Sequence, residues 1–321
     1  MKKLFIMIVL VLMSLVLIAE GQTVEEKQYM GIATSDPAAS YYPVGAGISS
    51  VLTKYVPGMS NVTVETTGSA IENGRLVGSG SDEIGFSTSF SSYRSYNGIG
   101  TEPQPNIRLW FSYAPTAFHI VVGKNSTIKS LNDLKGKKVS VGPPGSGTAL
   151  EAEDLFTEFG LKSGDKLEIT IQNLTFSEAG NALRDGNIDA FFAEQGMPSA
   201  VIIDLAVSGK IRLLSVPDNI INSIVEKKTY YKPVIITAEM YEGLDQQTNT
   251  IGAINLTIIN SELSDDLVYE MTKAVFEHAD EIAEKHPSAK YINIENAVAV
   301  KSIPYHPGAI RYYKEVGVWK D

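Results

Sequence analysis

Hydrophobic and polar positions alternate along the first third of the chain in a pattern that predicts strands and helices in turn. Short apolar runs predict strands at 29–34, 62–66, 83–87, 107–112 and 117–122. Amphipathic segments predict helices at 42–55 and 70–77. The first of these helices is followed by Pro57 and Gly58, which are typical of a helix end. Strands alternating with helices predict a parallel sheet with helices on its faces.

The same alternation begins again near residue 131. Further strands are expected at 138–141, 167–173, 188–192 and 211–214, with helices at 131–134, 146–159, 177–184 and 198–207. The segment 217–243 is less regular. It is followed by an apolar strand at 250–259, a long amphipathic helix at 265–284 and a short helix at 308–316.

These elements predict an α/β protein with two lobes. A chain of 321 residues is long enough for two domains. We expect lobe 1 to comprise 28–118 plus 250–321, and lobe 2 to be the inserted segment 119–249. Two strands, near 118–122 and 250–254, would then cross between the lobes, and two crossings of this kind act as a hinge.

The N-terminal segment predicts export from the cytoplasm. Lys2 and Lys3 precede an apolar run at 4–18, and small residues, Ala19 and Gly21, follow it. This is the layout of a signal peptide, here residues 1–21. The run is shorter than the ~20 residues that usually span a bilayer. An uncleaved membrane anchor is the alternative, and both interpretations place the rest of the chain in the periplasm or at the cell surface.

Composition excludes several classes of function. The chain has no cysteine, which excludes disulfides, thiolate nucleophiles and iron–sulfur clusters. Its net charge of -10 argues against a nucleic-acid partner. Backbone dipoles can still bind an anion locally in an acidic protein. No cofactor is expected.

The loop 141–148 (VGPPGSGT) is the first candidate for a binding site. It follows a predicted strand and opens a predicted helix. It resembles a phosphate-binding loop but lacks the lysine that would reach the phosphates, so nucleotide hydrolysis is not expected. Amides at a helix start, together with side-chain hydroxyls, bind carboxylate or phosphate. We therefore expect an anion at Ser146, Gly147 and Thr148; simple helix capping is the alternative.

Three more hydroxyl-rich loops follow strands, at 34–43, 66–69 and 87–92. In an open parallel sheet, ligands bind beyond the carboxyl ends of the strands, where these loops lie. From them we expect ligand contacts by Ser35, Tyr41, Ser69, Ser87 and Ser89. Gln195, at the end of a strand, and His119, on a crossing strand, are further candidates. Turn formation and capping are the alternatives for the loop residues, core packing for Tyr41 and a surface role for Gln195.

Nothing in the sequence supports an enzyme. The chain has no Gly-x-Ser-x-Gly elbow, and its four histidines are not at metal-ligand spacing from one another. We therefore expect neither a catalytic residue nor a metal site. A sensor domain that signals to a membrane partner stays open as an alternative to a transport function.

Four segments together resemble the TAXI family, the extracytoplasmic solute receptors of one branch of the TRAP transporters. They are 40–45 (SYYPVG), 66–73 (TTGSAIEN), 134–148 (LKGKKVSVGPPGSGT) and 303–315 (IPYHPGAIRYYKE). The segment 191–198 (FFAEQGMP) also resembles the family's strand-to-helix loop in the second lobe. The resemblance covers nearly the whole mature chain.

The resemblance implies a type II periplasmic-binding-protein fold and a multi-span membrane permease driven by a sodium or proton gradient. It also implies a small anionic solute such as glutamate, glutamine or a related dicarboxylate, bound by a monomer. One segment departs from the family, because 35–40 (SDPAAS) is usually rich in glycine. Its acidic Asp36 favours a ligand with an ammonium group, and hence an amino acid over a plain dicarboxylate.

Overall fold

The computed structural model describes residues 28–35, 37, 39–68, 70–144 and 146–320. The predicted signal peptide lies outside these residues, as do Asp36 and Ser69. Among the described residues, no helix combines the length and the apolar character needed to cross a bilayer.

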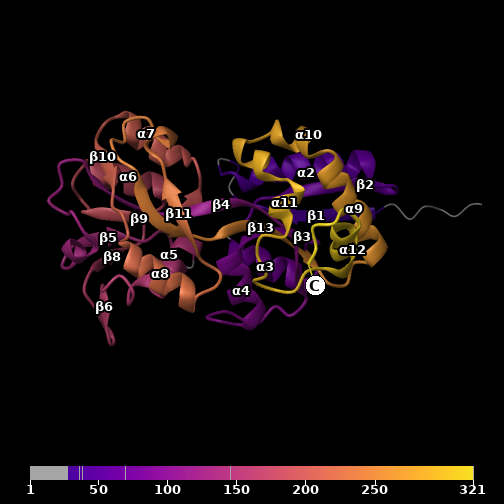
Figure 1. Ribbon diagram of the computed structural model, residues 1–321, viewed down its shortest axis with the longest axis horizontal. Helices are drawn as coiled ribbons and strands as arrows, with labels where there is room; N and C mark the ends of the chain where they lie inside the picture. Colours follow the sequence, from indigo (N-terminus) through magenta and orange to yellow (C-terminus); the bar gives the residue numbers. More distant parts are fainter. Residues whose placement is uncertain (1–27, 36, 38, 69, 145, 321) are drawn as a thin grey trace, which may run out of the picture.

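Two lobes lie side by side along the long axis of the molecule (Figure 1). One core joins buried residues from 30–114 to residues from 256–313, and we call the part built around it lobe 1. Two further cores join buried residues from 117–253, and Phe90 of lobe 1 packs against one of them. The part built around these cores is lobe 2. The two-lobed α/β architecture predicted from the sequence is therefore confirmed.

A continuous nine-stranded sheet runs through both lobes in the order β2-β1-β3-β13-β4-β9-β5-β8, with β10 paired to β4. Its strands are β1 (Gln28–Ala33), β2 (Met59–Glu65), β3 (Ile84–Thr88), β4 (Ile107–Gly123), β5 (Lys138–Ser140), β8 (Thr170–Gln172), β9 (Ala190–Gly196), β10 (Ile211–Leu213) and β13 (Ile254–Asn260). Two hairpins lie outside it and pair β6 (Lys162–Ser163) with β7 (Lys166–Leu167) and β11 (Lys232–Ile236) with β12 (Thr248–Gly252).

The centre of the sheet corrects the prediction of a parallel sheet. β1 is parallel to β2 and β3, and β5 is parallel to β8 and β9. β4 and β13, however, run antiparallel to each other and to their neighbours β9 and β3. The two strands predicted at 107–112 and 117–122 are one strand, β4, which continues from lobe 1 into lobe 2. Successive strands that pair in parallel need a crossover connection, usually a helix. The chain passes directly between the lobes, without such a helix, and the strands at this place pair antiparallel.

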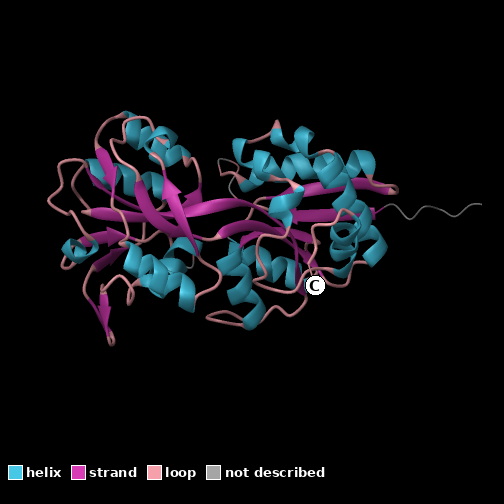
Figure 2. Ribbon diagram, viewed as in Figure 1, coloured by secondary structure: helices cyan, strands magenta, loops and turns pink. Residues whose placement is uncertain are grey.

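Helices cover both faces of the sheet in each lobe (Figure 2). The α-helices are α2 (Tyr41–Tyr55), α3 (Ala70–Ser79), α4 (Ser89–Asn97), α5 (Gly147–Leu155), α6 (Phe176–Arg184), α7 (Ala200–Val207), α8 (Asp218–Lys227), α9 (Asp265–Glu277), α10 (Ala279–Ala283), α11 (Ile294–Ala297) and α12 (Pro307–Glu315). Three short 3₁₀ helices are η1 (Leu131–Leu134), η2 (Ala238–Met240) and η3 (Pro287–Tyr291).

Helix α4 corrects the prediction of a hydroxyl-rich loop at 87–92. The helix forms because Thr88 caps it, accepting a hydrogen bond from the Ser91 amide at 3.1 Å. Gly98 ends the helix in the left-handed conformation, with φ of 69°. Ser95 faces Gly74 of α3 so closely that a Cβ at Gly74 would lie 2.7 Å from the serine hydroxyl. Small residues therefore bury this polar helix against α3.

The helix predicted at 265–284 is two helices, α9 and α10, which meet at His278. The His278 backbone leaves the helical region, with φ of -121° and ψ of 27°. Its ring stacks on Tyr55 of α2, with ring centroids 3.4 Å apart. The bend lets α10 as well as α9 pack against α2.

Two strands tie the lobes together where β4 passes the junction of β12 and β13. The Thr116 amide donates to the Ala253 carbonyl at 3.0 Å, and the Ala253 amide donates to the Thr116 hydroxyl at 2.9 Å. A Cβ at Gly252 would lie 1.9 Å from the Thr116 carbonyl oxygen, so only glycine fits there. The hydroxyl of Thr250 donates to the Phe118 carbonyl at 2.7 Å. Both crossing strands are thus held in one register at the lobe junction.

Candidate functional site

Five polar side chains from both lobes form a cluster at the lobe junction. We call Tyr41, Tyr113, Glu151, Glu194 and Tyr231 the junction cluster. Tyr41 begins α2 and Tyr113 lies on β4, so both belong to lobe 1. The other three come from α5, β9 and the segment between α8 and β11 of lobe 2. Tyr41 and Tyr113 both pack on Phe86, and the Glu194 amide donates to Thr148, which lies three residues before Glu151 on α5. Burial first, and then nearby charges that include both glutamates, raise the pKa of Tyr41 and of Tyr231.

Lobe 1 fixes its side of the cluster through Tyr41. The Tyr41 hydroxyl donates to Asn255 Oδ1 at 2.7 Å and lies 3.2 Å from the Ser87 carbonyl. Its ring stacks on Phe86 with centroids 5.0 Å apart. Tyr113 is 2% exposed, and its hydroxyl has no hydrogen-bond partner among the described residues.

Lobe 2 fixes its side through the start of α5. The Ser146 hydroxyl caps the helix by accepting from the Ala149 amide at 3.2 Å. The buried Thr148 hydroxyl accepts from the Glu194 amide at 3.1 Å, which holds the end of β9 against α5. One turn further along α5 lies Glu151, which is 1% exposed. The charge of Glu194 is among the causes that raise the pKa of Glu151, after burial.

Four polar atoms of the cluster have no hydrogen-bond partner within the part of the chain that the structure describes. They are Glu151 Oε2, Glu194 Oε1 and the hydroxyls of Tyr113 and Tyr231. Buried polar groups in native proteins are nearly always hydrogen-bonded, because leaving one unpaired costs about 1–3 kcal/mol. Four such atoms, contributed by two lobes at one junction, indicate a site that hydrogen-bonds something other than the chain itself.

Burial shifts both carboxyl groups toward the neutral form. It raises the pKa of Glu194 to about 7, although a hydrogen bond with the Thr116 side chain partly opposes the rise. Burial also raises the pKa of Glu151 well above its usual range, and the negative charges of Glu194 and then Asp154 add to this. The pKa of Tyr231 is raised as well, first by burial. The cluster therefore resists a net negative charge in this conformation.

Two helices begin at the junction. A Cβ at Gly147, the first residue of α5, would lie 3.8 Å from the Ser91 hydroxyl near the start of α4. The N-terminal ends of α4 and α5 therefore lie next to each other, one from each lobe. Helix N-termini carry partial positive charge and favour anions nearby.

A family model matches residues 32–317 of the chain, nearly the whole described length. The chain belongs to the NMT1-like family.

Three binding proteins are among the solved structures similar to this NMT1-like chain. The aliphatic sulphonate binding protein SsuA of Escherichia coli is 17% identical over 90% of this chain and 83% of that chain, with a TM-score of 0.51. The alkanesulfonate-binding protein SsuA of Xanthomonas axonopodis pv. citri, bound to MOPS, is 17% identical over 89% and 83%, with a TM-score of 0.50. The ligand-binding component of an ABC-type import system from Staphylococcus aureus is 13% identical over 91% and 100%, with a TM-score of 0.51. At these identities the likeness shows a shared fold, the two-lobed type II substrate-binding fold.

Several residues predicted from the sequence lie at or beside the junction cluster in this NMT1-like fold. Tyr41 belongs to the cluster, and Ser146, Gly147 and Thr148 form the start of α5 beside it. Ser87 is buried on β3, and its carbonyl rather than its hydroxyl meets Tyr41. Ser35 follows β1 in a half-buried position. Ser69 lies outside the described residues.

Two of the predicted ligand contacts bond to the chain instead. The Ser89 hydroxyl donates to the Tyr230 carbonyl at 2.8 Å and accepts from the Ile254 amide at 3.0 Å, so it links the two lobes. The Gln195 side-chain oxygen accepts a hydrogen bond from the Ser199 hydroxyl. Both groups hold the walls of the junction.

His119 lies in the core of lobe 2, where both of its ring nitrogens are hydrogen-bonded. Nε2 lies 2.8 Å from the Tyr241 hydroxyl and Nδ1 lies 3.1 Å from the Ala193 carbonyl. That carbonyl can only accept, so Nδ1 carries the proton and Nε2 accepts from the tyrosine. Burial lowers the pKa of His119 to about 4, which keeps the ring neutral. Neither nitrogen is left for a solute.

The sequence analysis did not propose Tyr113, Glu151, Glu194 or Tyr231 as ligand contacts. A signal for Glu151 was nonetheless present. It shares one stripe of the predicted helix with Thr148, Ala152 and Leu155, all of which are buried. A glutamate on a buried stripe is unusual, because burying a carboxylate is unfavourable without a partner.

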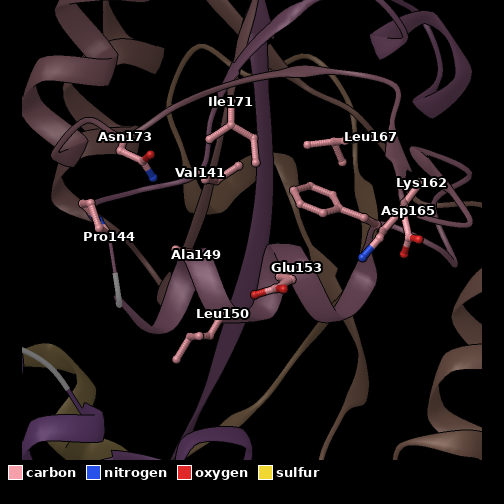
Figure 3. Close-up of a pocket in the computed structure, with 11 residues that line it drawn as sticks. Val141, Pro144, Ala149, Leu150, Glu153, Lys162, Asp165, Leu167, Ile171 and Asn173 are labelled. Atoms are coloured by element: carbon pink, nitrogen blue, oxygen red, sulfur yellow. The ribbon is translucent and has the colours of Figure 1, made fainter. Parts of the chain in front are cut away.

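A separate pocket of about 350 Å³ lies in lobe 2 against one side of α5. Figure 3 shows Val141, Leu167 and Ile171 above α5, with Glu153 on the facing side of the helix. Glu151 is two residues from Glu153 and so lies on the opposite side of the helix. The pocket therefore does not include the junction cluster.

Proposed function

We propose that this NMT1-like protein is an extracytoplasmic receptor that closes its two lobes on a small carboxylate-bearing solute and delivers it to a membrane permease. The observation that carries the proposal is the junction cluster, in which both lobes bring unpartnered buried polar atoms to one place. The fold supports the proposal, because similar solved structures include a periplasmic binding protein and the ligand-binding component of an import system. No bond-breaking step is required.

The start of α5 holds the carboxylate in this proposal. The helix presents its first amides and the capping loop of Ser146, Gly147 and Thr148 toward lobe 1. Free amides at a helix N-terminus bind carboxylates well, because donors and dipole point the same way. Tyr41 and the start of α4 approach from lobe 1.

Closure is the signal that the permease recognises. In the proposal the units 28–118 plus 250–321 and 119–249 move about the paired strands at Thr116 and Ala253. Those strands are joined by three hydrogen bonds between these two residues. A hinge of two paired strands permits rotation of whole lobes while keeping the register of the sheet.

The permease partner in the proposal is of the TRAP type, with glutamate, glutamine or a related solute as cargo. The resemblance of 40–45, 66–73, 134–148 and 303–315 to TAXI receptors supports this choice. The similar binding protein from Staphylococcus aureus belongs instead to an ABC-type import system. Uptake assays in cells that carry either the cognate multi-span permease or an ABC permease distinguish the two. Uptake that requires ATP hydrolysis and survives collapse of the ion gradients contradicts the TRAP assignment.

Thermal melting of the mature protein with a panel of amino acids and small organic acids tests the receptor function. A solute that binds only the folded state stabilises it by about 2.7 kcal/mol at a hundredfold excess over Kd. We expect a selective rise in Tm, accompanied by a smaller radius of gyration in X-ray scattering as the lobes close. A solute that raises Tm without changing the radius contradicts closure, and no rise with any solute contradicts the receptor function.

A further inference from the structure

The two buried glutamates are unexpected at a site for a purely anionic solute. A dicarboxylate would add negative charge beside Glu151 and Glu194, which already resist ionisation together. Like charges in a buried site repel strongly, because little water screens them. The junction cluster therefore needs a positive charge to become stable in its ionised form.

No cation of the chain supplies that charge. Among the described residues, neither Glu151 nor Glu194 takes part in an ion pair. Asp154, another carboxylate on the same helix, does have a partner, because Lys228 lies 2.9 Å from it and 3.4 Å from Glu158. The lysine of this region is thus already paired.

The unpartnered atoms match the hydrogen-bonding needs of an ammonium group. Glu151 Oε2 and Glu194 Oε1 are acceptors when ionised, and a tyrosine oxygen can accept a third bond. An ammonium group has three donors and no acceptor. The cluster also contributes three aromatic rings, whose faces attract cations.

From this geometry we infer that the solute carries a positively charged amine, which Glu151 and Glu194 bind at the junction among the rings of Tyr41, Tyr113 and Tyr231. The inference rests on the proposed function and names the class of its solute, an amine-bearing carboxylate of amino-acid type. A divalent metal ion fits less well. The described residues contain no group of three or more His, Cys, Asp or Glu side chains that could hold one.

Matched solutes that differ only in the amine test the inference. The mature protein is titrated by calorimetry with each of the twenty common L-amino acids, and the tightest is compared with the acid that lacks its amine. For L-glutamine that acid is glutaramate, and for L-glutamate it is glutarate. We expect the amine-free acid to bind at least about 30-fold more weakly, as for the loss of one partner of a buried charge pair. An amine-free acid that binds equally well or more tightly overturns the inference and leaves the receptor function standing.

Variants show whether the glutamates hold the amine. Glu151→Gln and Glu194→Gln each keep the shape of the side chain and remove the charge. Each should weaken binding of the amine-bearing solute at least about 30-fold and leave binding of the amine-free acid unchanged or tighter. Glu153→Gln is the matched control, because it lies on the same helix, is exposed and faces away from the cluster. Equal affinities in all three variants and the natural protein overturn the inference, provided that circular dichroism shows them folded.

Proton exchange gives a readout that does not depend on any variant. Binding of an amine ionises the cluster and releases protons, whereas binding of an anion alone takes protons up. Calorimetry near neutral pH, in buffers of different ionisation enthalpy, measures the direction. Proton uptake on binding overturns the inference. The inference is also overturned if Mg²⁺ or Ca²⁺ alone stabilises the natural protein and Glu194→Gln abolishes that stabilisation. If no amino acid and no matched acid binds at all, the proposed function fails together with the inference.

Discussion

Raising the pH should destabilise this closed conformation of the protein through Glu194. Burial raises the pKa of this carboxyl to about 7 in the folded state, against 4.5 for the ordinary group. Below pH 4.5 the group is protonated in both states and contributes nothing. Between 4.5 and about 7 the folded state binds more protons than the unfolded state, so the unfolding free energy falls as pH rises. Above that window the loss is complete.

The expected loss follows from the two pKa values. For one group with these values, the unfolding free energy falls by about 2–3 kcal/mol between about pH 5 and about pH 8. Glu151 acts in the same direction, because its pKa is raised as well. One kcal/mol corresponds to about 2–4 °C in Tm for proteins near this size, so Glu194 alone should lower Tm by roughly 5 °C or more.

Paired melting curves of the natural protein and Glu194→Gln isolate this effect. Other groups titrate over the same range in both proteins, so the difference between them reports Glu194. The variant should match the natural protein near pH 5 to within about 1 kcal/mol and exceed it by about 3 kcal/mol near pH 8. Glu153→Gln, on the exposed side of α5, should follow the natural protein throughout. Parallel pH profiles for the natural protein and Glu194→Gln would refute the reasoning.

Three further substitutions probe the junction and the core. Gly252→Ala places a methyl group against the Thr116 carbonyl and should lower stability in urea by about 2–3 kcal/mol; an unchanged midpoint contradicts the tight crossing. Ser89→Ala removes the hydroxyl that links the lobes and should lower the unfolding free energy by about 1–3 kcal/mol in the same assay. The control Ser208→Ala, at the exposed C-terminal cap of α7, should lower it by less than half as much. Trp110→Phe removes a 2.8 Å hydrogen bond to a buried threonine and leaves a void. Urea unfolding followed by near-UV dichroism should show that the unfolding free energy falls by about 2 kcal/mol, and an unchanged value contradicts this prediction.

Most elements of lobe 1 could be predicted because their apolar periodicity is strong. Helix α2 and strand β1 lie within one residue of their expected bounds. The prediction failed where burial comes from small polar residues, as in α4, whose serines pack beside Gly74. It also failed at 113–116, which separates the two strands predicted at 107–112 and 117–122 and includes Pro115. In β4 this proline lies where the neighbouring strand changes from β13 to β9, so its missing amide interrupts no ladder.

The candidate site was predictable only in part, for a related reason. A glycine-rich loop before a helix indicates an anion site from sequence alone, because backbone geometry determines the chemistry. The glutamates of the junction cluster gave no comparable local signal, since most glutamates lie on the surface. They come from lobe 2 and lie at the junction, where the start of α5 meets the start of α4 of lobe 1. That contact joins residues that are far apart in the chain, and no local pattern encodes it.

Helix α5 combines the predicted anion site and the inferred amine site in one rigid element. Gly147 begins the helix and Glu151 follows four residues later, about 6 Å along the axis at 1.5 Å per residue. Side chains on a helix lean toward its N-terminus, so the Glu151 carboxyl lies nearer to the first amides than its backbone does. A single small molecule can therefore reach both the amides and the carboxylate. A carboxylate alone would leave the buried glutamates without a positive partner, and an amine alone would leave the helix N-terminus without a negative one. A solute that carries both groups explains why a positive helix end and buried acids occur together.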